Sequence, residues 1–133
     1  MTHSSRRPRS LEVPGVSHGA APIPMGARVG NVIYSSGILG KDPATDKLPA
    51  DGAGQAKFVF QNMRTLLEVG GATLDDVVRM TVYLKDDSLR EPLNREWLAA
   101  FPDPHDRPAR HVLIQALPAT LLIQVEIVAV VSQ

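Results

Sequence analysis

The sequence contains no cysteine, few aromatic residues and no excess of either charge. Without cysteine the chain can form neither a disulfide nor a thiolate zinc site, and it holds no thiol nucleophile. Aromatic residues make up 5% of the 133 positions, and 14 Lys and Arg residues balance 14 Asp and Glu residues. A nucleic-acid-binding surface usually needs a basic patch and aromatic side chains that stack on bases. We therefore expect no nucleic acid as a partner.

Long apolar runs and metal-ligand spacings are missing as well. No apolar stretch approaches the roughly 20 residues that a membrane-spanning helix needs, so we expect no membrane partner. The four histidines, at positions 3, 18, 105 and 111, do not show the spacing of a metal site. The sequence also lacks a phosphate-binding glycine loop and a Ser-His-Asp elbow. The basic start of the chain has no apolar segment behind it, which predicts no secretory signal and a cytoplasmic location.

Length and composition indicate one globular domain. Hydrophobic residues make up 44% of the chain and charged residues 21%, and 133 residues suit a single core. The polar, basic residues 1–12 predict a disordered tail. Residues 13–133 carry no linker and no internal repeat, so we expect them to form one domain.

Alternation and turn residues predict four strands and two helices, all in one α/β or α+β layer with the helices on one face. Asp51 is expected to cap the first helix, and Gly70 or Gly71 to supply the left-handed residue after it. Ser88 and Glu91 have the spacing of a capping box for the second helix. The expected strands are 32–37, 76–84, 110–116 and 121–131, and the expected helices are 53–69 and 88–101.

The last expected strand, "LLIQVEIVAVV", is apolar on both faces. Two helices on one face of a sheet leave the other face without cover, and the chain has no further element to place there. A strand that is buried on both faces needs a second layer. We therefore expect the protein to associate with copies of itself.

Arg110 stands where a proline-studded loop gives way to a strand, in "RPARHVLIQALP". Its guanidinium either reaches water while the aliphatic stem packs, or it binds a carboxylate with two parallel hydrogen bonds. The prolines at 102, 104 and 108 restrict the backbone that directs this side chain.

Glu126 lies in the middle of the apolar last strand. Carboxylates are rarely buried without a partner. Glu126 therefore either pairs with a cation, for which Arg110 on a neighbouring strand is the obvious candidate, or it faces a water-lined cleft as an acid/base group that activates water.

Three further polar residues are weaker candidates. The hydroxyl of Ser36 could bind a substrate, although a serine before a glycine is usually part of a turn. Asn94 in the second helix could cap it or orient a loop. His111 alternates to the face opposite Arg110 and is more often a structural residue at such a position.

Several blocks of the sequence together resemble the RidA/YjgF family, which older naming calls endoribonuclease L-PSP. The likeness covers residues 13 to 131. The blocks are "GNVIYSSG" at 30–37, "GGATLDDVVRMTVYLKD" at 70–86, "LNREWLAAF" at 93–101, "RPARHVLIQALP" at 107–118 and "VEIVAV" at 125–130.

This resemblance implies a chorismate-mutase-like α+β fold, with a mixed sheet, two helices on one face and three subunits whose sheets form a central barrel. It also implies hydrolysis of reactive 2-imino and 2-enamino acids to 2-keto acids and ammonia, in clefts between subunits. Arg110 would bind the substrate carboxylate and Glu126 would position the attacking water. Ser36, Gly37 and Asn94 would be supporting cleft residues, and neither a metal nor an organic cofactor is expected.

Three positions depart from the pattern of the characterised deaminases in this family. Ile23 stands where they carry tyrosine, Ile38 where they commonly carry glutamine, and His111 where they carry serine or threonine. The resemblance therefore implies a less polar pocket, lined in part by Ile23 and Ile38. The alternative function is a non-catalytic trimer that binds a small carboxylate or a partner protein, and the ribonuclease of the older name is a third.

Overall fold

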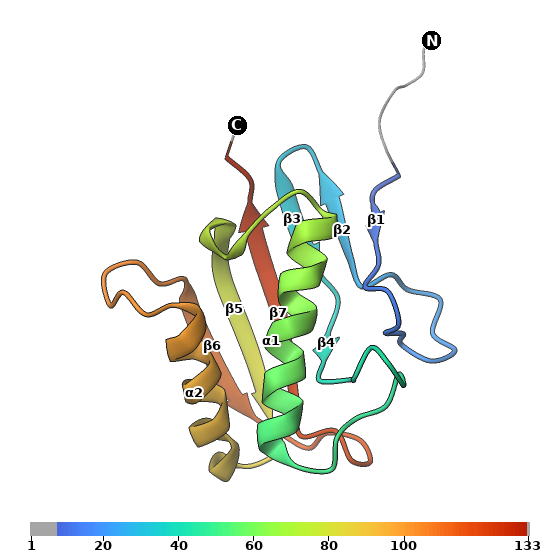
Figure 1. Cartoon of the computed structure of the whole chain (residues 1–133), viewed down its shortest axis with the longest axis vertical. Helices are drawn as coiled ribbons and strands as arrows, with labels where there is room; N and C mark the ends of the chain where they lie inside the picture. Colours follow the sequence, from blue (N-terminus) through green and yellow to red (C-terminus); the bar gives the residue numbers. More distant parts are fainter. Residues whose placement is uncertain (1–7, 133) are drawn as a thin grey trace.

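The computed structural model describes residues 8–132, and its architecture is one sheet with two helices on the same face (Figure 1). The strand order in this described part is β1-β2-β3-β7-β5-β6, and β4 also pairs with β7. β5 and β6 run parallel, whereas β7 is antiparallel to β3, β4 and β5, so the predicted mixed sheet and α+β class are confirmed. The elements are β1 (Ser10–Leu11), β2 (Gly26–Val29), β3 (Val32–Ser35), β4 (Ile38–Leu39), α1 (Gly52–Val69), η1 (Leu74–Asp76), β5 (Val77–Leu84), η2 (Asp87–Leu89), α2 (Arg90–Ala100), β6 (Ala109–Ile114) and β7 (Ile123–Val130).

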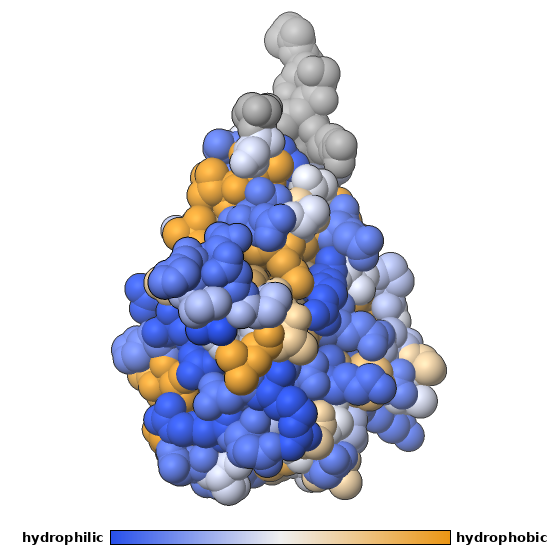
Figure 2. All heavy atoms as spheres, turned by 60° about the vertical axis from the view of Figure 1, so that its left-hand side comes forward, coloured by the Kyte–Doolittle hydropathy of each residue, from blue (hydrophilic) through white to orange (hydrophobic). Residues whose placement is uncertain are grey.

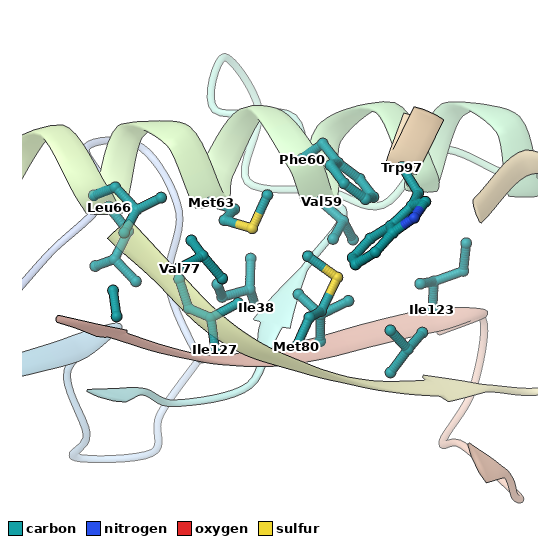
Figure 3. Packing of buried hydrophobic residues seen from close by; sticks show 14 of the residues in the cluster. Ile38, Val59, Phe60, Met63, Leu66, Val77, Met80, Trp97, Ile123 and Ile127 are labelled. Carbon is teal, nitrogen blue, oxygen red and sulfur yellow. The ribbon is translucent and has the colours of Figure 1, made fainter. Parts of the chain in front are cut away.

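The core lies between the sheet and the helices (Figure 3). Side chains alternate between the two faces of a strand, and along β7 every second residue is buried. Helix α1 closes this layer with one apolar face, because its buried residues recur at helical spacing. The fully buried side chains that meet there include Ile33, Ile38, Val59, Phe60, Met63, Leu66, Met80, Val82, Val125 and Ile127.

The other face of the sheet has no helix over it in the described chain (Figure 1). The β7 residues that point there, such as Val128 and Val130, are half-buried or exposed, although they are apolar. Tyr34 of β3 pairs with Val128 and therefore lies on the same side of the sheet, where it is 61% exposed. We call this helix-free side of the sheet the open face.

The ends of α1 follow the sequence prediction. Asp51 is the N-cap, and its side chain accepts a hydrogen bond from the backbone N–H of Gly54. After the helix, Gly71 adopts the left-handed conformation with a φ of 80°, whereas Gly70 remains right-handed. Of the two glycines proposed for this role, Gly71 therefore fills it.

The predicted capping box of Ser88 and Glu91 is wrong. A 3-10 turn, η2, precedes α2, and Asp86 caps this turn by accepting a hydrogen bond from the Ser88 backbone N–H at 3.0 Å. α2 then begins at Arg90, and its N-cap Leu89 makes no side-chain capping bond. Ser88 turns its hydroxyl to the Asp86 carboxylate instead, because the turn places that carboxylate beside it.

The strand order differs from the expected one. The last two strands were expected to be neighbours, but β5 lies between β6 and β7. Three short strands, β1, β2 and β4, were not predicted. The two residues of β1 and of β4 are too few to show alternation.

The N-terminal segment is ordered from further back than predicted. The tail was expected to end at residue 12, yet Ser10 and Leu11 pair with β2, and the side chain of Leu11 is buried. Residues 1–7 of the predicted tail lie outside the described residues. Within residues 8–132, the helices are too short or too polar to cross a membrane.

We predict that Asp86→Ala lowers the free energy of unfolding by about 1 kcal/mol, the usual value of a capping side chain. Ser88→Ala should change it by less than about 0.5 kcal/mol, because the cap is the Asp86 carboxylate and the hydroxyl is exposed. Urea unfolding with an unchanged m-value measures both. A larger loss from Ser88→Ala than from Asp86→Ala would contradict the assignment.

Candidate functional site

Glu126 points to the open face from the middle of β7. It lies directly opposite Thr81 of β5, and Thr81 in turn lies opposite His111 of β6. Paired residues on neighbouring strands share one face of a sheet, so these three polar side chains form a row across the open face. The Tyr83 hydroxyl donates a hydrogen bond of 3.1 Å to Oε1 of Glu126.

A bulge between β3 and β4 faces Glu126. Tyr34 pairs with Val128 and Ile38 pairs with Val125, so three residues of one strand lie opposite two of the other. The hydroxyl of Ser35, within the bulge, accepts a hydrogen bond of 2.8 Å from the Ile127 backbone N–H. The extra residue interrupts the ladder beside the carboxylate.

Gly37 is the last residue of this bulge, and the side chain of Gln124 lies close to the position that a Cβ atom would occupy. A Cβ atom at this position would lie 2.5 Å from the amide nitrogen of Gln124, the half-buried open-face neighbour of Glu126 along β7. On the other side, Nε2 of His18 lies 2.7 Å from the Gly37 carbonyl oxygen. Glycine at position 37 therefore leaves room for the Gln124 side chain, and its carbonyl oxygen lies within hydrogen-bond distance of His18.

Arg110 lies on β6 and points to the helix side of the sheet, because its partner on β5 is the buried Met80. Nη1 of Arg110 donates a hydrogen bond of 2.8 Å to Oδ1 of Asn94 on α2. The guanidinium carbon lies 4.8 Å from the ring centroid of Trp97, one helical turn further along α2. These contacts hold the arginine in a cation–π stack with a single neutral hydrogen-bond partner.

Burial beneath α2 lowers the pKa of Arg110, and the like charge of Arg90 lowers it further. An arginine in a protein remains protonated at neutral pH all the same. Within residues 8–132, no carboxylate forms a salt bridge with this cation. The site therefore contains a half-buried positive charge without a protein anion to balance it.

The expected ion pair between Arg110 and Glu126 is absent from the described residues. The two side chains point to opposite faces of the sheet, and a whole strand separates their backbones. The two strands were expected to be adjacent, and the strand order rules out that contact within one chain.

The remaining candidates lie apart from one another. Ser36 donates its hydroxyl to the Pro24 carbonyl at 2.8 Å, which is a structural role in the described chain. Ile38 is 2% exposed, so the expectation that it lines a pocket is wrong: it lies in the core, where β4 packs under α1. Ile23 is 49% exposed and is available to a ligand. His111 is exposed on the face opposite Arg110, as its alternation predicted.

The surface around α2 and β6 is mixed in character. Figure 2 looks onto the side of the molecule that carries α2 and β6 and shows mostly hydrophilic residues in its lower part, with hydrophobic atoms between them. A cavity of about 370 Å³ elsewhere is lined by residues of α1 and of the segment after it, including Arg64, Glu68 and Asp75. None of the predicted site residues lines that cavity. Among residues 8–132, no three potential ligand side chains cluster as a metal site would require.

Sequence reasoning missed three residues of this arrangement, Tyr83, Gln124 and His18. The alternation of β5 already assigned Tyr83 to the face that carries Arg79 and Thr81. Only the pairing of β5 with β7 places Tyr83 beside Glu126. Alternation within a single strand does not show which strands pair.

Comparison with known proteins identifies the family. The family model described as "Endoribonuclease L-PSP" matches residues 20–131. The chain belongs to the RidA/YjgF family. A RutC family protein of Pyrococcus abyssi is 37% identical over 116 residues, which cover 82% of this chain and 90% of that protein. A 2-iminobutanoate/2-iminopropanoate deaminase of Escherichia coli is 33% identical over 111 residues, covering 82% of this chain and 87% of that protein.

The fold agrees with solved structures of the family. The crystal structure of RidA from an Antarctic Psychrobacter species matches with a TM-score of 0.82 at 31% identity, over 95% of this chain and 100% of that chain. The α+β fold of RidA proteins, a mixed sheet with two helices, is therefore the fold of this chain.

Proposed function

We propose that the protein hydrolyses reactive 2-imino and 2-enamino acids to 2-keto acids and ammonia. The observation that carries this proposal is Arg110, a half-buried cation held by Asn94 and Trp97 without a carboxylate partner in the described residues. Such a guanidinium is suited to bind the carboxylate that every 2-imino acid carries. The 33% identity to a protein named 2-iminobutanoate/2-iminopropanoate deaminase supports the same reaction.

In the proposed reaction, Glu126 orients a water molecule and accepts one of its protons as the oxygen attacks the imine carbon. The imine nitrogen takes up the proton held by Glu126 and the proton of the new hydroxyl group and leaves as ammonia, while the carbon becomes the carbonyl carbon of the keto acid. A 2-enamino acid reacts in the same way after it tautomerises to the imine. Attack needs only a polarised C=N bond, water and a base. No metal or organic cofactor is required for this chemistry.

We further propose that the active form is a homotrimer in which clefts between subunits bring Arg110 of one copy near Glu126 of another. Two observations support this assembly. The two side chains occupy opposite faces within one chain, and the open face exposes Val29, Tyr34 and Val130 at 50%, 61% and 41%. Apolar surface of this kind is stabilised when a second copy covers it. We also propose a cytoplasmic location.

Two other functions remain as alternatives. A trimer that binds a small carboxylate or a partner protein without catalysis is favoured by Ile23 and His111, which replace more polar or smaller residues of the deaminase pattern. The ribonuclease suggested by the family description has less support, because the formal net charge is zero and aromatic residues make up 5% of the chain.

The deciding assay generates 2-aminoacrylate in situ with a dehydratase, adds the protein and follows keto-acid formation. We expect the protein to raise the rate of keto-acid formation above the uncatalysed rate. An unchanged rate across imines from several amino acids would support the binding function instead.

We predict a particle of about three times the 14.4 kDa chain mass in light scattering at micromolar concentration. Tyr34→Glu should dissociate it, because a charge on the open face would be buried without a partner. Val69→Glu adds the same charge at the exposed end of α1, so it is the control and should leave the mass unchanged. A monomeric wild type would contradict both the trimer and the shared cleft.

We predict that Arg110→Ala lowers kcat/KM by about 10²–10⁴-fold, since each charge-assisted hydrogen bond to the substrate is worth roughly 1.5–3 kcal/mol. Arg110→Lys keeps the charge but loses the planar fork, so it should recover only a small part. Arg95→Ala is the control, because Arg95 is an exposed arginine of α2 paired with Glu91. An Arg110→Ala variant that stays folded and fully active would refute the carboxylate-binding role.

We predict that imines derived from leucine or methionine are better substrates than those derived from alanine. Ile23 is the one exposed residue of the two isoleucines proposed for the pocket, and each methylene that it contacts contributes on the order of 1 kcal/mol to discrimination. Ile23→Ala should therefore reduce the preference by about tenfold. Equal specificity constants for both classes in the wild type would rule out this role.

A further inference from the structure

Tyr83 lies in the candidate site, in contact with Glu126. It lies on β5 opposite Gln124, two residues before Glu126 along β7, so its side chain shares the open face with the carboxylate. The distance between Oη of Tyr83 and Oε1 of Glu126 is 3.1 Å. This is a side-chain hydrogen bond between two strands, made at the residue that the proposed reaction needs as its base.

We propose that Tyr83 is a positioning residue: its hydroxyl holds one oxygen of Glu126 so that the other oxygen faces the attacking water. This inference rests on the proposed function and deepens it. Tyr83 acts through Glu126 and does not itself contact the substrate.

The two carboxylate oxygens of Glu126 differ in their hydrogen bonds, which supports this role. Oε1 has the Tyr83 donor, and no donor within residues 8–132 forms a hydrogen bond with Oε2. Thr81, which lies directly opposite Glu126 on β5, instead accepts a hydrogen bond from Nε of Arg79 at 3.4 Å. A free carboxylate can rotate about its last bond, and one fixed oxygen removes that rotation.

The protonation state of Tyr83 suits a donor. The hydrogen bond to Glu126 raises the pKa of Tyr83 above its ordinary value of 10.0, and desolvation raises it further. The phenol therefore keeps its proton throughout the neutral range. A phenolate in this place would repel the carboxylate rather than orient it.

A purely structural role fits the surroundings less well. Tyr83 is half-buried on the open face and is not among the residues of the hydrophobic core. The strand is already fixed by its backbone pairing with β6 and β7, and by Met80, Val82 and Leu84 on the opposite face. The hydroxyl can be removed without loss of this packing.

The test compares Tyr83→Phe with Tyr34→Phe, its matched control. Tyr34 is the second tyrosine of the chain, lies on the same face and makes no side-chain hydrogen bond within the described residues. Tyr83→Phe should lower kcat by about 10- to 100-fold, the value of one hydrogen bond to a charged group, and change KM by less than about twofold. Tyr34→Phe should leave both constants unchanged.

A double-mutant cycle shows whether Tyr83 acts through Glu126. Glu126→Gln should lower kcat strongly, and adding Tyr83→Phe to it should cause no further loss, because the carboxylate that Tyr83 orients is gone. Losses that multiply would mean that Tyr83 acts independently of Glu126, and an active Tyr83→Phe variant with wild-type kcat would also overturn the inference. An inactive wild type would overturn the proposed function and this inference together, whereas an active wild type with an equally active Tyr83→Phe variant would overturn this inference alone.

Discussion

The alternation of side chains along β7 is the constraint on which the rest of the structure depends. Ile123, Val125 and Ile127 are buried under α1, and this burial fixes the register of the strand because a shift by one residue would expose them all. The same register forces Glu126 onto the open face. The hydrophobic core therefore decides where the proposed base lies, without any contact to the base itself.

The bulge at Ser35–Gly37 turns this position into a candidate site. A regular ladder would pair every backbone group beside Glu126. One extra residue interrupts the ladder, and the Ser35 hydroxyl takes over the Ile127 backbone N–H that would otherwise lose its partner. The irregularity is thus compensated locally, and it leaves Gly37 without a side chain next to the carboxylate.

Periodicity predicted the elements that are long enough to show it, including α1, β5 and β7, and it identified Arg110 and Glu126 as unusual. It failed where the information is not local. β7 pairs with β3, β4 and β5 and not with β6, so the predicted pairing of Arg110 with Glu126 had no basis in the fold. The resemblance supplied the fold, but it also suggested a pocket role for Ile38, which packing under α1 excludes.

The separation of Arg110 and Glu126 links the proposed catalysis to the proposed assembly. A carboxylate bound on the helix side of β6 cannot reach a base on the open face of the same chain, so the proposed reaction requires a second copy. The two regions are also built differently. Arg110 is held by α2 through Asn94 and Trp97, whereas Glu126 is held by strands through Tyr83. In the proposed reaction, substrate binding and water activation would therefore rest on separate elements of the fold.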